Sequence, residues 1–76
     1  MHNDDLVTRK FSEGIKSLRA KRNWTQEELA EKSEISYKNI QYLEAKHPTC
    51  PSLTTLHKLA KAFNTTLAGL FKKIGL

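Results

Sequence analysis

Apolar residues recur at helical intervals from the start of the chain. The first series comprises Val7, Phe11, Ile15 and Leu18. Its members are separated by four, four and three residues, the spacing of one face of an α-helix. This series predicts a first helix over about residues 4–22. Asp4 and Asp5 fit its N-terminal end, because acidic side chains there complement the helix dipole.

Capping residues predict where four more helices begin. They are Thr25, Ser36, Ser52 and Thr66. Thr25 has Glu28 three positions later, as in a capping box, and predicts a second helix over about residues 26–32. The other three caps precede apolar residues at helical spacing. These residues are Ile40 and Leu43, then Leu53, Leu56, Leu59, Ala60 and Phe63, then Leu67, Leu70, Phe71 and Ile74.

Breaks between these segments separate the predicted helices. Pro48 and Pro51 end any continuation of the third helix, and Asn64 suits the end of the fourth. The sequence has no strand pattern and no internal repeat. We therefore predict an all-α protein of five helices, with residues 1–76 forming one domain.

Composition narrows the class of protein. A chain of 76 residues has room for one small domain and none for a separate effector-sensing or catalytic domain. It contains no apolar run long enough to cross a bilayer, and its first residues do not resemble a secretory signal. Cys50 is the only cysteine, which excludes an intramolecular disulfide and agrees with a reducing cytoplasm. We expect a folded cytoplasmic protein.

The net charge of +5 and the pI near 9.6 favour a polyanionic partner, although many ordinary small proteins are also basic. The distribution of charge is more informative than its sum. Acidic residues crowd the second predicted helix and its end, at Glu27, Glu28, Glu31 and Glu34. Basic residues crowd the first 22 positions, at Arg9, Lys10, Lys16, Arg19, Lys21 and Arg22.

The second and third predicted helices, within residues 25–44, are short and joined by only a few residues. If Ile40 and Leu43 face the core, the outward face of the third helix carries Tyr37, Lys38, Gln41 and Tyr42. Two helices joined in this way form a helix-turn-helix, whose second helix fits the major groove of DNA.

The sequence resembles the lambda-repressor and Cro type of DNA-binding domain, the Xre family, from about residue 11 to residue 71. The residues that carry this resemblance are Ile15, Leu18-Arg19, Thr25-Gln26-Glu27-Glu28-Leu29-Ala30, Ile35-Ser36, Ile40, Leu43-Glu44, Pro51-Ser52-Leu53, Leu56 and Leu59-Ala60. It implies a five-helix fold and binding of double-stranded DNA as a two-fold dimer, hence a palindromic operator. Within this type, the chain is similar to small phage repressors and to the controller proteins of restriction-modification systems.

The resemblance also implies roles for individual residues. Base edges would be read by Tyr37, Lys38 and Tyr42, flanked by Gln41, whose amide can both donate and accept. Phosphates would be contacted by Gln26, Asn39 and Lys46, together with Thr25, which is primarily the helix cap. Arg19 and Glu44 would form a structural salt bridge. The alternative for the two tyrosines is a role as partly buried edge residues with hydrated hydroxyls, although the helical phase favours contact with DNA. Without the resemblance, Lys38 fits equally as solvated surface.

Two positions depart from the family pattern. Glu34 stands where the family commonly has a glycine in the turn, so a left-handed backbone there would be strained. Residues 45–50 lack the glycine that often follows the third helix. The loop contacts to DNA are therefore the least secure part of the resemblance.

Other chemistry has little support in the sequence. Trp24 is more consistent with packing between the first two helices than with base stacking. His47 and Cys50 are three residues apart, but even with His57 they do not complete a tetrahedral metal site. The sequence has no nucleophile beside a base and no phosphate-binding glycine loop. We expect no metal, no cofactor, no small-molecule effector and no enzymatic activity.

The predicted function is that of a bacterial or phage transcriptional regulator that acts by occupying its operator as a dimer. The dimer interface is assigned to the fifth helix, at Leu67, Leu70, Phe71 and Ile74, because these residues and Leu76 are more apolar surface than one small domain hides. The alternative is that all of them pack on the first helix. An alternative function is an antitoxin-like interaction module that binds a toxin protein.

Overall fold

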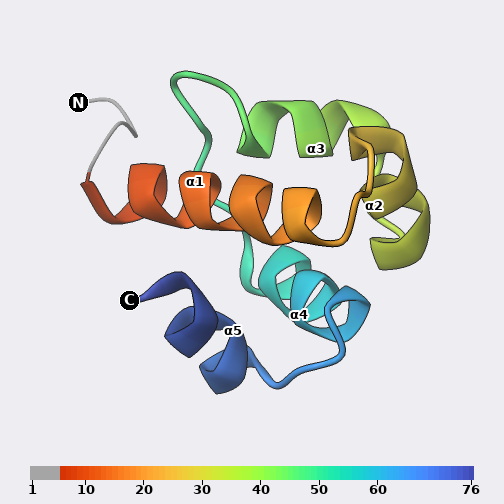
Figure 1. The fold of residues 1–76 in the computed structure, drawn as a ribbon. Coiled ribbons are helices and arrows are strands. Elements are labelled where there is room, and N and C mark those ends of the chain that lie inside the picture. Colours follow the sequence, from red (N-terminus) through yellow and green to blue (C-terminus); the bar gives the residue numbers. More distant parts are fainter. Residues whose placement is uncertain (1–5) are drawn as a thin grey trace.

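Helices make up most of the chain in the computed structural model, which describes residues 6–76 (Figure 1). They are α1 (Leu6–Lys21), α2 (Gln26–Ser33), α3 (Tyr37–Leu43), α4 (Leu53–Ala62) and α5 (Leu67–Ile74). No strand occurs within this range, and the predicted all-α, five-helix fold is confirmed. The two aspartates expected at the start of α1, Asp4 and Asp5, lie outside the described residues. No helix of residues 6–76 has the length and apolar character that a membrane crossing requires.

The helices begin at the residues that the capping pattern predicts. The Thr25 hydroxyl accepts a hydrogen bond from the Glu28 amide at 3.0 Å, and the Glu28 carboxylate accepts one from the Thr25 amide at 2.8 Å. Both bonds of the capping box are therefore present. Ser36, Ser52 and Thr66 cap α3, α4 and α5 in the same way, each accepting from the amide three residues later.

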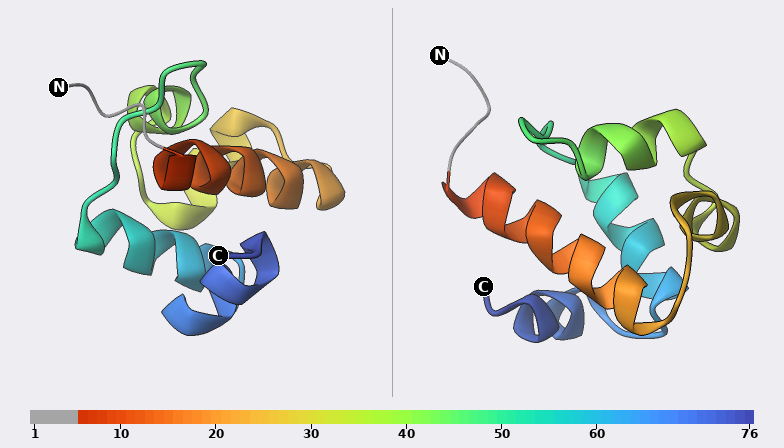
Figure 2. Two further views of the ribbon diagram at one scale, coloured as in Figure 1. Left: turned by 90° about the vertical axis from the view of Figure 1, so that its left-hand side faces the viewer. Right: turned by 45° about the horizontal axis from the view of Figure 1, so that its top comes forward.

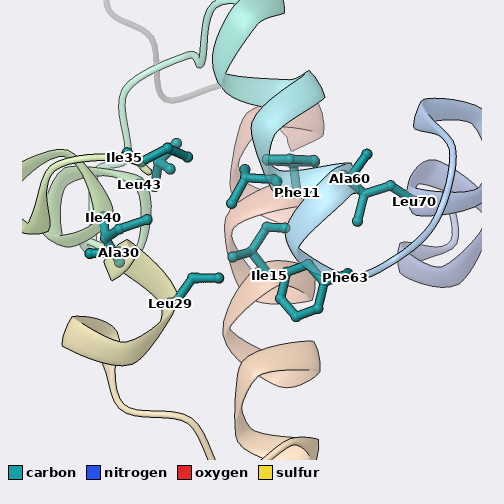
Figure 3. Close-up of a cluster of buried hydrophobic side chains, with 11 residues drawn as sticks. Phe11, Ile15, Leu29, Ala30, Ile35, Ile40, Leu43, Ala60, Phe63 and Leu70 are labelled. Atoms are coloured by element: carbon teal, nitrogen blue, oxygen red, sulfur yellow. The ribbon is translucent and has the colours of Figure 1, made fainter. Parts of the chain in front are cut away.

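The helices surround one hydrophobic core. In Figure 1 α1 crosses the molecule, with α3 above it and α4 and α5 below it, and the left view of Figure 2 shows the same arrangement. Figure 3 shows side chains of α2 and α3 facing those of α1, α4 and α5. The largest fully buried side chains come from every helix or its C-terminal residue: Ile15, Leu29, Ile40, Leu59, Phe63 and Leu70. Each contributes about 1.5–3 kcal/mol through removal of its apolar surface from water.

Two residues predicted to face inward are exposed instead. Val7 in α1 and Leu53 in α4 have exposed fractions of 63% and 72%. Each lies in the first turn of its helix, before the first of the helix's buried residues, so the apolar repeat extends beyond the buried part of the helix. Leu70 was predicted to lie at the dimer interface, but its side chain is fully buried within the single chain and is not available to a second copy.

The connection between α2 and α3 turns through a left-handed residue. Glu34 has φ 61° and ψ 29°, and its amide donates to the carbonyl of Ala30 at the end of α2. The amide of Ile35 donates to the same carbonyl at 3.2 Å. A glutamate thus adopts the left-handed conformation that glycine tolerates best. Asn64, predicted to end α4, is also left-handed, with φ 57°.

Trp24 packs, as expected, but its partner lies at the end of α4. Its ring stacks on that of Phe63 with centroids 5.4 Å apart. The Arg22 guanidinium lies 5.2 Å and the Lys32 ammonium 5.1 Å from the indole centroid. Arg22 also donates to the carbonyl of Phe63 at 3.2 Å. These contacts attach the α1–α2 connection to α4.

Candidate nucleic-acid interface

The outward face of α3 carries the side chains that the sequence predicts for it. Ile40 and Leu43 are buried, which fixes the rotation of this short helix. On the opposite side, Tyr37 and Tyr42 are 44% and 48% exposed. Lys38 and Gln41 are also exposed. α3 therefore presents two phenol hydroxyls, an ammonium and a carboxamide on its solvent side.

The N-terminus of α2 is a second polar surface of the same motif. The first backbone amides of a helix have no partner within it, so they are available to an anion. The Thr25 hydroxyl accepts from one amide of this turn and keeps its own hydrogen to donate. Gln26, the first residue of α2, is half-buried, with its side chain turned towards the end of α3.

A network of three side chains joins α1, α2 and α3. Arg19 donates to both carboxylate oxygens of Glu44, each at 2.8 Å, so the expected ion pair is present and bidentate. A third nitrogen of Arg19 donates to the Trp24 carbonyl at 2.7 Å. The Gln26 amide donates to Glu44 Oε1 at 3.0 Å. The Glu44 side chain is only 1% exposed, so its charge is compensated within this network.

The ion pair also affects the titration of Arg19. Its hydrogen bonds to Glu44 raise the pKa of the guanidinium above its usual value, while burial lowers it in part. A raised pKa stabilises the fold at every pH below the unfolded value and loses that effect only as pH rises through the folded value. The Arg19 guanidinium therefore stays charged throughout the neutral pH range.

The two remaining phosphate candidates are Asn39, within α3, and Lys46, which follows it. Asn39 is exposed and borders a polar hollow shared with Ser52 and Thr55 at the start of α4. Lys46 is exposed in the loop after α3. The structure brings Gln26 against Glu44 at the end of α3, with Lys46 in the loop that follows, and Asn39 lies on the side of α3 towards α4.

Basic residues of α1 lie next to Lys46, and sequence reasoning assigned them no role. Arg9 and Lys16 line a hollow of about 210 Å³ together with Lys46 and His47, and Glu13 supplies one acidic group to its edge. The crowding of positive charge in the first 22 residues was the available signal. This signal could not show that α1 packs beside the loop after α3, because that contact arises only in the folded protein.

Metal-ligand side chains do not gather in the described part of the chain. Among residues 6–76, no group of three or more His, Cys, Asp or Glu side chains is close enough to hold a metal ion. Cys50 is exposed, with its thiol 3.9 Å from the carbonyl of Pro51. Within this range, His47 and Cys50 gain no third metal-ligating side chain.

Taken together, the short turn, the buried seam of α3 and its polar outer face define a helix-turn-helix of the DNA-binding class. Residues 15–70 match the sequence profile of the helix-turn-helix family. The chain belongs to this family, in its lambda-repressor-like, or Xre, branch. This is a family of regulators, not of enzymes.

Two proteins of Archaeoglobus fulgidus are similar to this chain. Each bears the name "Uncharacterized HTH-type transcriptional regulator" and is 42% identical to it over 57 residues. The similarity covers 75% of this chain and 79% and 80% of the two relatives. It therefore extends over most of each protein.

Proposed function

We propose that this protein is a sequence-specific regulator of transcription that places α3 in the major groove of double-stranded DNA. The observation that carries the proposal is the division of α3 into a buried seam and an outer face of Tyr37, Lys38, Gln41 and Tyr42. Membership of the helix-turn-helix family and the regulator names of both relatives support the same function.

The side chains of α3 would read base edges. The Lys38 ammonium can donate to the N7 and O6 atoms of guanine, and the Gln41 carboxamide can pair with both polar atoms of adenine. The Tyr37 and Tyr42 hydroxyls can donate or accept, and their rings can contact a thymine methyl group. These four side chains are exposed, so no core packing has to break when DNA binds.

A different set of residues would hold the DNA backbone. The amides at the start of α2, with Thr25 and Gln26, suit one phosphate, because the helix dipole and the free N–H groups both favour an anion. Asn39, on the α4 side of α3, and Lys46, in the loop after α3, suit further phosphates. Such contacts orient the protein on the duplex without reading its sequence.

Dimerisation through α5 is part of the proposal. Phe71 packs edge-on against Phe11 of α1, with ring centroids 6.1 Å apart, so some of the apolar surface of α5 is used within the chain. Leu67, Phe71 and Ile74 nevertheless remain only half-buried. Beside them an apolar hollow of about 290 Å³ is lined by Val7, Thr8, Phe11, Cys50, Pro51, Leu56, Phe71 and Leu76.

A second copy is the occupant that this surface favours, since an exposed apolar patch of this kind marks an interface and a two-fold dimer matches it with itself. The dimer would occupy a palindromic operator and regulate transcription by occupancy. It would do so in the cytoplasm, where an operator is found in a prokaryotic cell. Leu70, assigned to this interface from the sequence, would instead hold α5 against the core of its own chain, because its side chain is fully buried.

The test is selection of bound sites from random duplexes, followed by affinity measurements at several salt concentrations. The proposal predicts an enriched palindrome. The logarithm of affinity should fall with the logarithm of salt concentration by about 0.9 per phosphate neutralised. Recovery of a single half-site would contradict the dimer, and failure to enrich any sequence would contradict specific DNA binding.

A further inference from the structure

We infer that Glu44 is a positioning residue for DNA binding: it orients the Gln26 carboxamide so that one N–H of this group is presented to a phosphate. The inference rests on the proposed function and names a residue that does not touch DNA itself. It starts from the 3.0 Å hydrogen bond between Gln26 Nε2 and Glu44 Oε1, which joins the start of α2 to the residue that ends α3.

The chemistry of the two groups fixes which end of the amide faces which partner. An ionised carboxylate only accepts hydrogen bonds, so the group that Gln26 turns towards Glu44 has to be its NH₂. That NH₂ carries two hydrogens, and one of them is used. The second remains for a phosphate oxygen, while the amide oxygen, which would repel a phosphate, is kept on the other side. A glutamine without this bond would present either end.

Glu44 can serve as an anchor because it is itself held in place. Both of its oxygens accept from Arg19 at 2.8 Å, and its side chain is almost fully enclosed. The third bond of Arg19, to the Trp24 carbonyl at 2.7 Å, holds the backbone immediately before Thr25, which caps α2. One guanidinium therefore fixes both the carboxylate and the chain entering α2. Gln26 is ordered before DNA arrives, and less conformational freedom is lost on binding.

A double-mutant cycle on DNA affinity distinguishes this role from a purely structural one. The variants are Gln26→Ala, Glu44→Gln and the two combined, measured on operator and scrambled duplexes. If Glu44 acts through Gln26, Glu44→Gln should lower affinity roughly tenfold when Gln26 is present and by less than about twofold when it is Ala. Glu44→Gln also removes one negative charge, and because this acts equally in both backgrounds it cancels in the comparison.

Two other results would overturn the inference in distinguishable ways. An equal loss in both backgrounds would show that Glu44 supports only the fold, and the proposed phosphate contact of Gln26 would stand. No loss in Gln26→Ala on any duplex would remove that contact from the proposed function and the inference with it. Circular dichroism at low temperature identifies the variants that are folded.

Because replacing a buried charge partner endangers folding, the unmodified protein provides a second test. Gln26 and Gln41 are its two glutamines, and Gln41 is exposed on α3, so one side-chain amide NMR spectrum contains both the test and its control. Without DNA, the Gln41 amide should have an order parameter below about 0.6, the range of flexible groups, and Gln26 should lie clearly above it. Equal mobility of the two amides would overturn the inference.

Discussion

Replacing Glu34 with glycine should leave the protein as stable as before or make it more stable. Glu34 is left-handed, with φ 61°, a conformation that costs an L-residue about 1–2 kcal/mol and glycine almost nothing. The contacts of this residue within the turn use its backbone: its amide donates to Ala30, and its carbonyl accepts from the Lys58 ammonium at 3.4 Å. The substitution retains both. The greater freedom of glycine in the unfolded chain offsets about 0.4–1 kcal/mol of this relief, which leaves a net gain of about 0–1.6 kcal/mol.

Glu31→Gly is the matched control. Glu31 is exposed inside α2, so the same side chain and the same charge are removed from a right-handed position. There glycine should cost about 0.5–1 kcal/mol of helix stability. The two variants should differ by about 0.5–2.6 kcal/mol in thermal unfolding followed by circular dichroism, and each kcal/mol corresponds to roughly 4–8 °C in Tm for a domain of this size. If Glu34→Gly lowers Tm as much as Glu31→Gly does, the left-handed turn is not the source of strain.

Three further substitutions test the Arg19–Glu44 ion pair, the contact between α1 and α5, and the proposed dimer interface. Arg19→Met should cost about 3–5 kcal/mol in denaturant unfolding, because it leaves the enclosed carboxylate of Glu44 without its partner; a loss below about 1 kcal/mol would contradict the network. Gly14→Ala should destabilise the fold although alanine favours helices, since its Cβ would lie 2.5 Å from the Ile74 side chain; an unchanged Tm would show that α5 yields easily. Phe71→Glu should shift sedimentation towards monomer, and an unaltered dimer would remove α5 from the interface.

Local signals in the sequence were sufficient to predict the helices, because caps and helical periodicity act within a few residues. The Thr25 and Glu28 capping box lies within one turn, and the structure contains both of its bonds. The same periodicity failed at Val7 and Leu53. A repeat of apolar residues continues to the end of a helix, whereas burial also depends on how far the neighbouring helices extend.

In the candidate site, too, features set by one helix could be predicted from the sequence, and features set by packing between helices could not. The exposed face of α3 could be predicted, since burial of Ile40 and Leu43 determines which side chains point outwards. The bond from Gln26 to Glu44 could not, because it joins residues 18 positions apart and depends on the packing of α2 against α3. The position of Lys16 beside Lys46 also arises only when α1 folds against the loop after α3.

The measurement that tests the central claim most directly compares residues proposed to read bases with one proposed to hold the backbone. Lys38→Ala, Tyr42→Ala and Lys46→Ala would each be titrated with operator and scrambled duplexes at several salt concentrations. Loss of Lys38 or Tyr42 should change base preference by about 1–3 kcal/mol for each good contact. Loss of Lys46 should weaken binding to both duplexes alike and reduce the salt slope by about one unit. If Lys38→Ala and Tyr42→Ala instead lower both affinities equally, or leave both unchanged, α3 does not read the sequence and the proposed function is wrong.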